Sequence, residues 1–148
     1  MVLKPRAWTA VLLGGLAAGV GDSVLALVLY PVSLVRIYQS VAAGLLGRDA
    51  YQGGLATAAL GMFLHFFIAT AAAFVYVAAS SRLELLRRQP VPCGLVFGAA
   101  VYFFMNFVVL PLSRARASGV AWKPMVGHAL LVGLPIALIA RYRLGRGE

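Results

Sequence analysis

Four long apolar runs constrain this 148-residue chain more than any other feature of its sequence. They cover about residues 8–30, 55–79, 91–112 and 125–140. Three have the length of about 17–25 residues that a helix needs to cross a bilayer, and the last is slightly shorter. Because lipid offers the backbone no hydrogen bonds, runs of this length are expected to be helical. The sequence therefore predicts one all-α membrane domain, a bundle of four transmembrane helices.

The composition points to the same fold class. Hydrophobic residues make up 62% of the chain and charged residues 11%, against roughly 45–50% and 25% in soluble domains. A chain of this size has too little interior to hide so many apolar side chains from water. The first run follows Lys4 and Arg6 as a signal peptide would, but it is too long, contains Asp22 and precedes three further runs. We therefore expect it to be a true span.

The net charge of +9 marks membrane topology rather than nucleic-acid binding, because the basic residues lie at the ends of the apolar runs. An even number of spans places both termini and the 80–90 loop on one side of the membrane. That side carries eight basic residues and the other carries five, which predicts cytoplasmic termini. The eight are Lys4, Arg6, Arg82, Arg87, Arg88, Arg141, Arg143 and Arg146, and the five are Arg36, Arg48, Arg114, Arg116 and Lys123.

The basic cluster of Arg82, Arg87 and Arg88 is expected to set this topology and to contact anionic lipid headgroups.

On the other side of the membrane, the connection between the first two spans is not an ordinary loop. Apolar residues recur in it at helical spacing between polar ones, which predicts an amphipathic helix at about residues 33–46. This helix would lie in the outer interface or form a short re-entrant segment.

Two pairs of glycines have the spacing that lets membrane helices pack closely. Gly15 and Gly19 lie on the first span, and Gly94 and Gly98 lie on the third. Asp22 continues the first glycine face, and Asn106 the second, at similar depth below the helix ends. The two spans thus share a faint repeat, a glycine pair followed by a polar residue on the same face. We therefore predict that the first and third spans touch and that Asp22 lies close to Asn106.

Asp22 is the only carboxylate inside a span. An ionised acid in mid-membrane costs at least about 2.5–3.5 kcal/mol, so such a residue pairs, lines water or stays protonated. Two interpretations are open. Asp22 is either a site for a proton or cation, or a hydrogen-bonding group that fixes helix packing.

Three further polar residues complete the candidate intramembrane site. His65 lies ~15 Å and His128 ~5 Å from the outer ends of their spans, and this mismatch argues against a haem held between them. A proton relay from Asp22 to His65 and a simple hydrogen-bonding role are both possible. If the 31–45 helix folds back over the bundle, Arg36 is the natural counter-charge for Asp22. The four intramembrane polar residues would then form one outward-facing polar cavity with Arg36, Gln39, Arg114 and Arg116.

Motifs for catalysis or cofactor binding are absent from the sequence. It contains no nucleophile elbow, metal-ligand spacing or phosphate-binding loop, and its single cysteine, Cys93, cannot form an internal disulfide. We therefore expect no catalytic residue, metal or cofactor. The first functional prediction is an accessory or scaffolding protein that packs against lipids and other membrane helices, in a homo-oligomer or a larger complex. The alternatives are a proton- or cation-coupled transporter that uses Asp22, and a membrane enzyme that acts on a lipid or quinone.

Five segments spread over nearly the whole chain carry a family resemblance: GGLAAGVGD (14–22), VRIYQS (35–40), LHFFIA (64–69), YFFMNFVVLPLS (102–113) and GLPIAL (133–138). Together they resemble a group of small, uncharacterised bacterial inner-membrane proteins with four predicted spans, described as YagU-like. The resemblance implies a bacterial inner-membrane location and supplies no reaction. The candidate site residues within or near these segments are Asp22, Arg36, His65, Asn106 and His128.

Overall fold

The computed structural model describes residues 4–115 and 119–145, which are predominantly helical and contain no strand. Four helices are long and apolar enough to cross a membrane, so the predicted fold class is confirmed. The first is α1 (Pro5–Leu29) and the second is α3 (Gly54–Ser80). The third span covers Pro90–Leu112 and the fourth covers Trp122–Leu144. The spans begin one to three residues before the predicted ranges, and their ends differ from the predicted ones by up to four residues, the largest difference being in the fourth span.

The third and fourth spans each widen into one π-helical turn. The third consists of α5 (Pro90–Phe104), η2 (Met105–Val109) and α6 (Leu110–Leu112). The fourth consists of α7 (Trp122–His128), η3 (Ala129–Gly133) and α8 (Leu134–Leu144). Each π turn ends two residues before a proline, Pro111 or Pro135. Because proline has no N–H and crowds the preceding turn, it disturbs the regular α-helical bonding at these two places.

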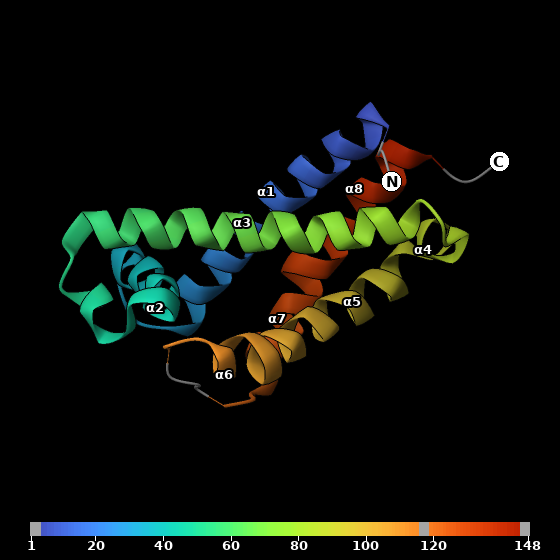
Figure 1. Cartoon of the computed structure of the whole chain (residues 1–148). Coiled ribbons are helices and arrows are strands. Elements are labelled where there is room, and N and C mark those ends of the chain that lie inside the picture. Colours follow the sequence, from blue (N-terminus) through green and yellow to red (C-terminus); the bar gives the residue numbers. More distant parts are fainter. Residues whose placement is uncertain (1–3, 116–118, 146–148) are drawn as a thin grey trace.

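The fourth span lies beside α1, and α1 in turn lies beside α3 (Figure 1). The third span packs against the fourth over most of its length. Small residues fill the interfaces, so the helix axes approach closely. The buried core residues of this bundle are Ala7, Ala10, Val11, Ala18, Ala73, Tyr76, Val77, Val132, Ile136, Ala137 and Ala140.

The predicted contact between the first and third spans is wrong, because α1 does not pack along α5 in the described part of the chain. The two glycine faces have different partners. A Cβ atom added at Gly15 would meet Thr70, and one at Gly19 would meet the ring of Phe66, both on α3. At Gly94 and Gly98 an added Cβ would meet the backbone of the fourth span.

The amphipathic helix predicted at 33–46 is present as α2 (Leu34–Leu46). The hydroxyl of Ser33 caps it by accepting a hydrogen bond from the Arg36 N–H at 3.3 Å. Its buried side packs against α3, where Gly61 leaves room for the carbonyl of Tyr38. Gly47, with φ of 65°, then turns the chain into the short helix η1 (Gly47–Tyr51). The helix is thus folded back onto the bundle.

The start of α1 and the end of α8 lie at the same end of the bundle as α4 (Glu84–Arg88) (Figure 1). The helices α2 and α6 lie toward the opposite end. This arrangement follows from an even number of spans. Two of the basic residues counted for topology, Arg116 and Arg146, lie outside the described residues.

Candidate functional site

Three titratable side chains from three spans meet inside the bundle. Asp22 comes from α1, His65 from α3 and His128 from α7. Nδ1 of His65 lies 3.9 Å from Oδ2 of Asp22, and Nε2 of His128 lies 3.5 Å from Oδ1 of Asp22. The side chains are largely enclosed, with exposed fractions of 27% for Asp22, 11% for His65 and 18% for His128. All three line a cavity of about 150 Å³.

The position of His65 fixes which of its nitrogens carries a proton. Its Nε2 lies 2.8 Å from the carbonyl oxygen of Gly19 and 3.2 Å from Oγ of Ser23. A carbonyl oxygen only accepts hydrogen bonds, so Nε2 of His65 must donate. In the neutral ring, the lone pair on Nδ1 then faces the carboxyl group of Asp22.

The same reasoning applies to His128. Its Nδ1 lies 3.0 Å from the carbonyl oxygen of Pro124, one turn earlier on the same helix. Nδ1 therefore donates to that oxygen, and the neutral ring turns the lone pair of Nε2 toward Asp22. Each histidine thus uses one nitrogen to bond the backbone and presents the other to the same carboxyl group.

The facing atoms of the three groups include no hydrogen-bond donor when Asp22 is ionised and both rings are neutral. With an ionised Asp22 and two neutral rings, two nitrogen lone pairs would face a carboxylate, and all three groups would be acceptors. One added proton, on either ring or on the carboxyl group, converts one of these contacts into a donor–acceptor pair. The cavity also has room for several water molecules at ~30 Å³ each.

Neighbouring residues hold both rings in place. Oγ of Ser23 lies 3.1 Å from the hydroxyl of Tyr38, which links the cluster to α2. The ring of Tyr38 also makes an edge-on contact with His65, with centroids 5.8 Å apart. Tyr102 on α5 makes the corresponding contact with His128 at 5.4 Å, and its hydroxyl accepts a hydrogen bond from the Ala121 N–H at 2.8 Å. Ser23, Tyr38 and Tyr102 were not among the site residues predicted from the sequence. Only the position of Ser23 next to Asp22 gave a signal.

The predicted depth mismatch between the two histidines is wrong. The fourth span begins at Trp122, three residues before the predicted start, which places His128 ~9 Å from the helix end. The first turns of α3 lie beside α2, and α3 and α1 run in different directions (Figure 1). Depths counted from helix ends therefore refer to no common plane, and His65 and His128 reach the same carboxyl group.

Two other predicted site residues lie elsewhere. Nδ2 of Asn106 donates to the carbonyl of Tyr102 at 2.9 Å, and Asn106 does not line the cavity in the described structure. Arg36 forms no ion pair with any described residue, so it is not the counter-charge of Asp22. Its guanidinium carbon lies 3.9 Å from the centre of the Tyr51 ring.

The basic residues Arg82, Arg87 and Arg88 lie on α4 or just before it. Arg88 forms an exposed ion pair with Glu84 at 2.8 Å. Nε of Arg87 is buried and has no hydrogen-bond partner within the described ranges. The cluster lies at the same end as the two termini, far from α2 in Figure 1.

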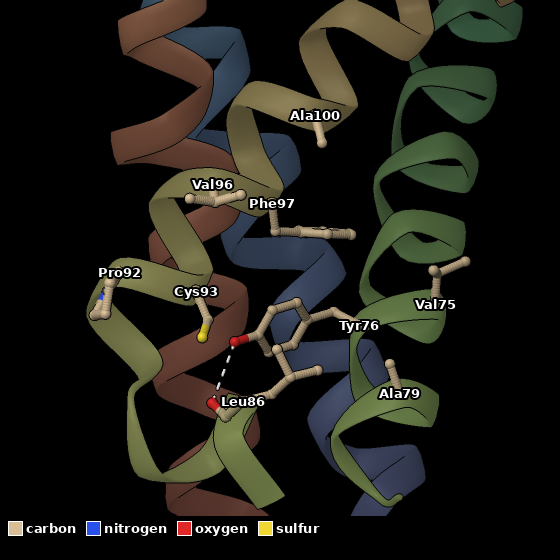
Figure 2. Close-up of a pocket in the computed structure, with 9 residues that line it drawn as sticks. All are labelled: Val75, Tyr76, Ala79, Leu86, Pro92, Cys93, Val96, Phe97 and Ala100. Carbon is tan, nitrogen blue, oxygen red and sulfur yellow. Dashed lines mark hydrogen bonds between the residues drawn. The ribbon is translucent and has the colours of Figure 1, made fainter. Parts of the chain in front are cut away.

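An apolar groove lies between α3 and α5 on the flank of the bundle, next to the cavity. Its first section of about 550 Å³ shares Ile68, Ala72, Val101 and Met105 with the cavity. A second section of about 470 Å³ continues toward α4. Figure 2 shows this section, where Tyr76 extends from α3 toward α5 and its hydroxyl donates to the carbonyl of Leu86 at 3.3 Å. The cluster of Asp22, His65 and His128 therefore lies next to an apolar groove on the flank of the bundle.

No group of three or more His, Cys, Asp or Glu side chains is arranged to hold a metal ion within residues 4–115 and 119–145. Comparisons of the chain with protein families, curated proteins and solved structures found no match.

Proposed function

We propose that this chain is a small transporter of the bacterial inner membrane that couples substrate movement to proton binding at Asp22, His65 and His128. We also propose that it belongs with the YagU-like proteins and that its termini face the cytoplasm. One observation carries the functional proposal. Each histidine donates a hydrogen bond from one ring nitrogen to a backbone carbonyl, and its other ring nitrogen faces the same carboxyl group.

The cluster offers a proton and a cation the same site. Without a proton, the carboxylate of Asp22 carries a negative charge beside two nitrogen lone pairs, and this charge would also attract an organic cation. Binding of the cation would then release the proton, and binding of the proton would release the cation. Such competition is the minimum that exchange of a cation for a proton requires.

The groove between α3 and α5 supports a substrate that reaches the cluster from the bilayer. Its lining is apolar, and it shares Ile68, Ala72, Val101 and Met105 with the cavity. A cavity of about 150 Å³ suits a small charged head group, and the groove of about 550 Å³ suits an apolar tail. An amphiphilic cation combines the two.

The geometry favours this proposal over the accessory role that the sequence alone placed first. A residue that only fixes helix packing needs one hydrogen-bonding partner, whereas Asp22 faces two titratable ones. The groove also supports a second candidate function. In this alternative, the protein is an enzyme that exchanges protons with the head group of a lipid or quinone at the same cluster.

Proteoliposomes loaded with a pH-sensitive dye test the proposal. An alkyltrimethylammonium cation is a suitable external probe because its charge is permanent. We expect the wild-type protein to release protons from the lumen when the cation is added, and Asp22→Asn to abolish this exchange. Asn106→Ala, which changes a polar residue outside the cavity, is the matched control and should retain it. Equal exchange by Asp22→Asn and the wild type would refute the coupling.

A further inference from the structure

A second and larger hollow lies beside α2, near the ends of α1 and the third span. Its volume is about 740 Å³. It is lined by residues of α1, α2 and η1 and by the segment that follows α6. The described lining residues of this hollow and of the Asp22 cavity do not overlap, so the two are separate sites.

Three arginines line this hollow: Arg36 from α2, Arg48 from η1 and Arg114 from the segment after α6. Its described lining includes no acidic residue, and none of the three arginines forms an ion pair with a described residue. Three positive charges around one hollow repel each other, so an anion in the hollow would be favourable.

Backbone contacts bring the three arginines together. The N–H of Arg114 donates to the carbonyl of Gly44 at the end of α2, at 2.9 Å. Gly47 follows in the left-handed region, and a Cβ atom there would lie 3.8 Å from Cβ of Arg114. Arg48 is the next residue. The ring of Tyr51 lies 3.9 Å from the guanidinium carbon of Arg36 and limits its orientation.

We propose that this hollow binds a phosphate group carried by a larger molecule. The planar guanidinium group offers paired N–H donors that match phosphate oxygens, which explains why arginine rather than lysine suits such a site. The volume exceeds what a phosphate ion fills. Val32 and Leu110 add apolar lining beside the arginines, as a phosphate ester with an apolar or sugar-like portion requires. A phospholipid headgroup and a soluble phosphate ester share this chemistry.

A cysteine placed in the hollow reports whether it is occupied. Ser40 is an exposed lining residue of the hollow, and Ser40→Cys in a Cys93→Ala background gives the chain a single thiol there. The measurement is the rate of reaction with N-ethylmaleimide. Leu45→Cys, also on α2 and exposed but not part of the described lining, is the matched control for effects of the surrounding lipid.

Two arms distinguish the sources of the phosphate. In the first, the protein is placed in nanodiscs of phosphatidylglycerol or of phosphatidylcholine. In the second, glycerol 3-phosphate is added to the phosphatidylcholine nanodiscs. We expect the cysteine at position 40 to react several-fold more slowly when the hollow is occupied, while the cysteine at position 45 keeps its rate. Slowing by phosphatidylglycerol alone identifies a lipid headgroup, and slowing by glycerol 3-phosphate identifies a soluble ester.

Substitution of the arginines completes the test. The triple change of Arg36, Arg48 and Arg114 to Gln should abolish the slowing, and the triple change to Lys should restore part of it because charge returns without the paired donors. The proposal is overturned if neither arm slows the reaction, or if the slowing persists in the Gln variant.

Discussion

Nε2 of His128 lies 3.5 Å from Oδ1 of Asp22, although the two residues belong to different spans and are separated by most of the chain. The other nitrogen of the ring, Nδ1, donates to the carbonyl of Pro124 at 3.0 Å. His65 repeats this arrangement on the opposite side of the carboxyl group, with its Nε2 bonded to Gly19. The backbone thus orients two imidazoles toward one carboxyl group, and the proposed proton site rests on this arrangement. The predictions below follow from this arrangement, from the groove beside it and from the packing that holds both.

Asp22 can be tested for a packing role separately from its role in proton binding. Asp22→Asn keeps the shape and the hydrogen-bonding capacity of the side chain, so the thermal unfolding midpoint should change little while proton-coupled exchange is lost. Asp22→Leu leaves the facing nitrogens of His65 and His128 without a polar partner, which should cost about 1–3 kcal/mol. If Asp22→Asn preserved both the midpoint and the exchange, Asp22 would be a packing residue.

The hydroxyl of Tyr38 should contribute to stability through Ser23. Tyr38→Phe removes the 3.1 Å contact with Oγ of Ser23 and keeps the ring against His65. We expect a loss of about 0.5–1.5 kcal/mol in the free energy of unfolding. Unfolding by a graded denaturant in mixed micelles measures it. Tyr142→Phe on the exposed surface of α8 is the control and should leave that free energy unchanged.

Gly61 should tolerate no side chain, because a Cβ atom there would collide with the carbonyl of Tyr38. Gly61→Ala should therefore push α2 away from α3 and destabilise the protein by about 1–3 kcal/mol. Gly44→Ala is the matched control, since its nearest neighbour would be 3.8 Å away in ordinary contact. It should be neutral or stabilising by about 0.5–1 kcal/mol, as expected for Gly→Ala within a helix. Thermal unfolding of the two variants in detergent gives the comparison, and equal midpoints would contradict the observed packing.

The groove should be the route to the cluster. Val101 lines both the cavity and the groove, so Val101→Trp should block passage between them. We expect this variant to lose exchange of the alkyltrimethylammonium cation in proteoliposomes. Val28→Trp, on an exposed part of α1 outside the described groove, should retain it. Full exchange activity of Val101→Trp would contradict the groove as the route to the cluster.

Hydropathy alone was enough to predict the four spans, because lipid imposes both their length and their helical structure. The helix at 33–46 was predictable from its amphipathic spacing. The partners of the glycine faces were not, since Gly15 and Gly94 report close packing without specifying the neighbour. His128 was placed too near the surface because the fourth span begins earlier than its apolar run. Arg36 was assigned to Asp22 by charge, but the fold turns it toward Tyr51.

Nitrogen NMR of the imidazole rings in lipid bicelles tests the central claim most directly. The spectrum distinguishes a ring nitrogen that carries or shares a proton from one with a bare lone pair. In the wild type, we predict that Nδ1 of His65 or Nε2 of His128 carries or shares a proton. In Asp22→Ala at the same pH, both of these nitrogens should be bare. A wild-type spectrum in which both are bare, and which Asp22→Ala leaves unchanged, would contradict a shared proton-binding site.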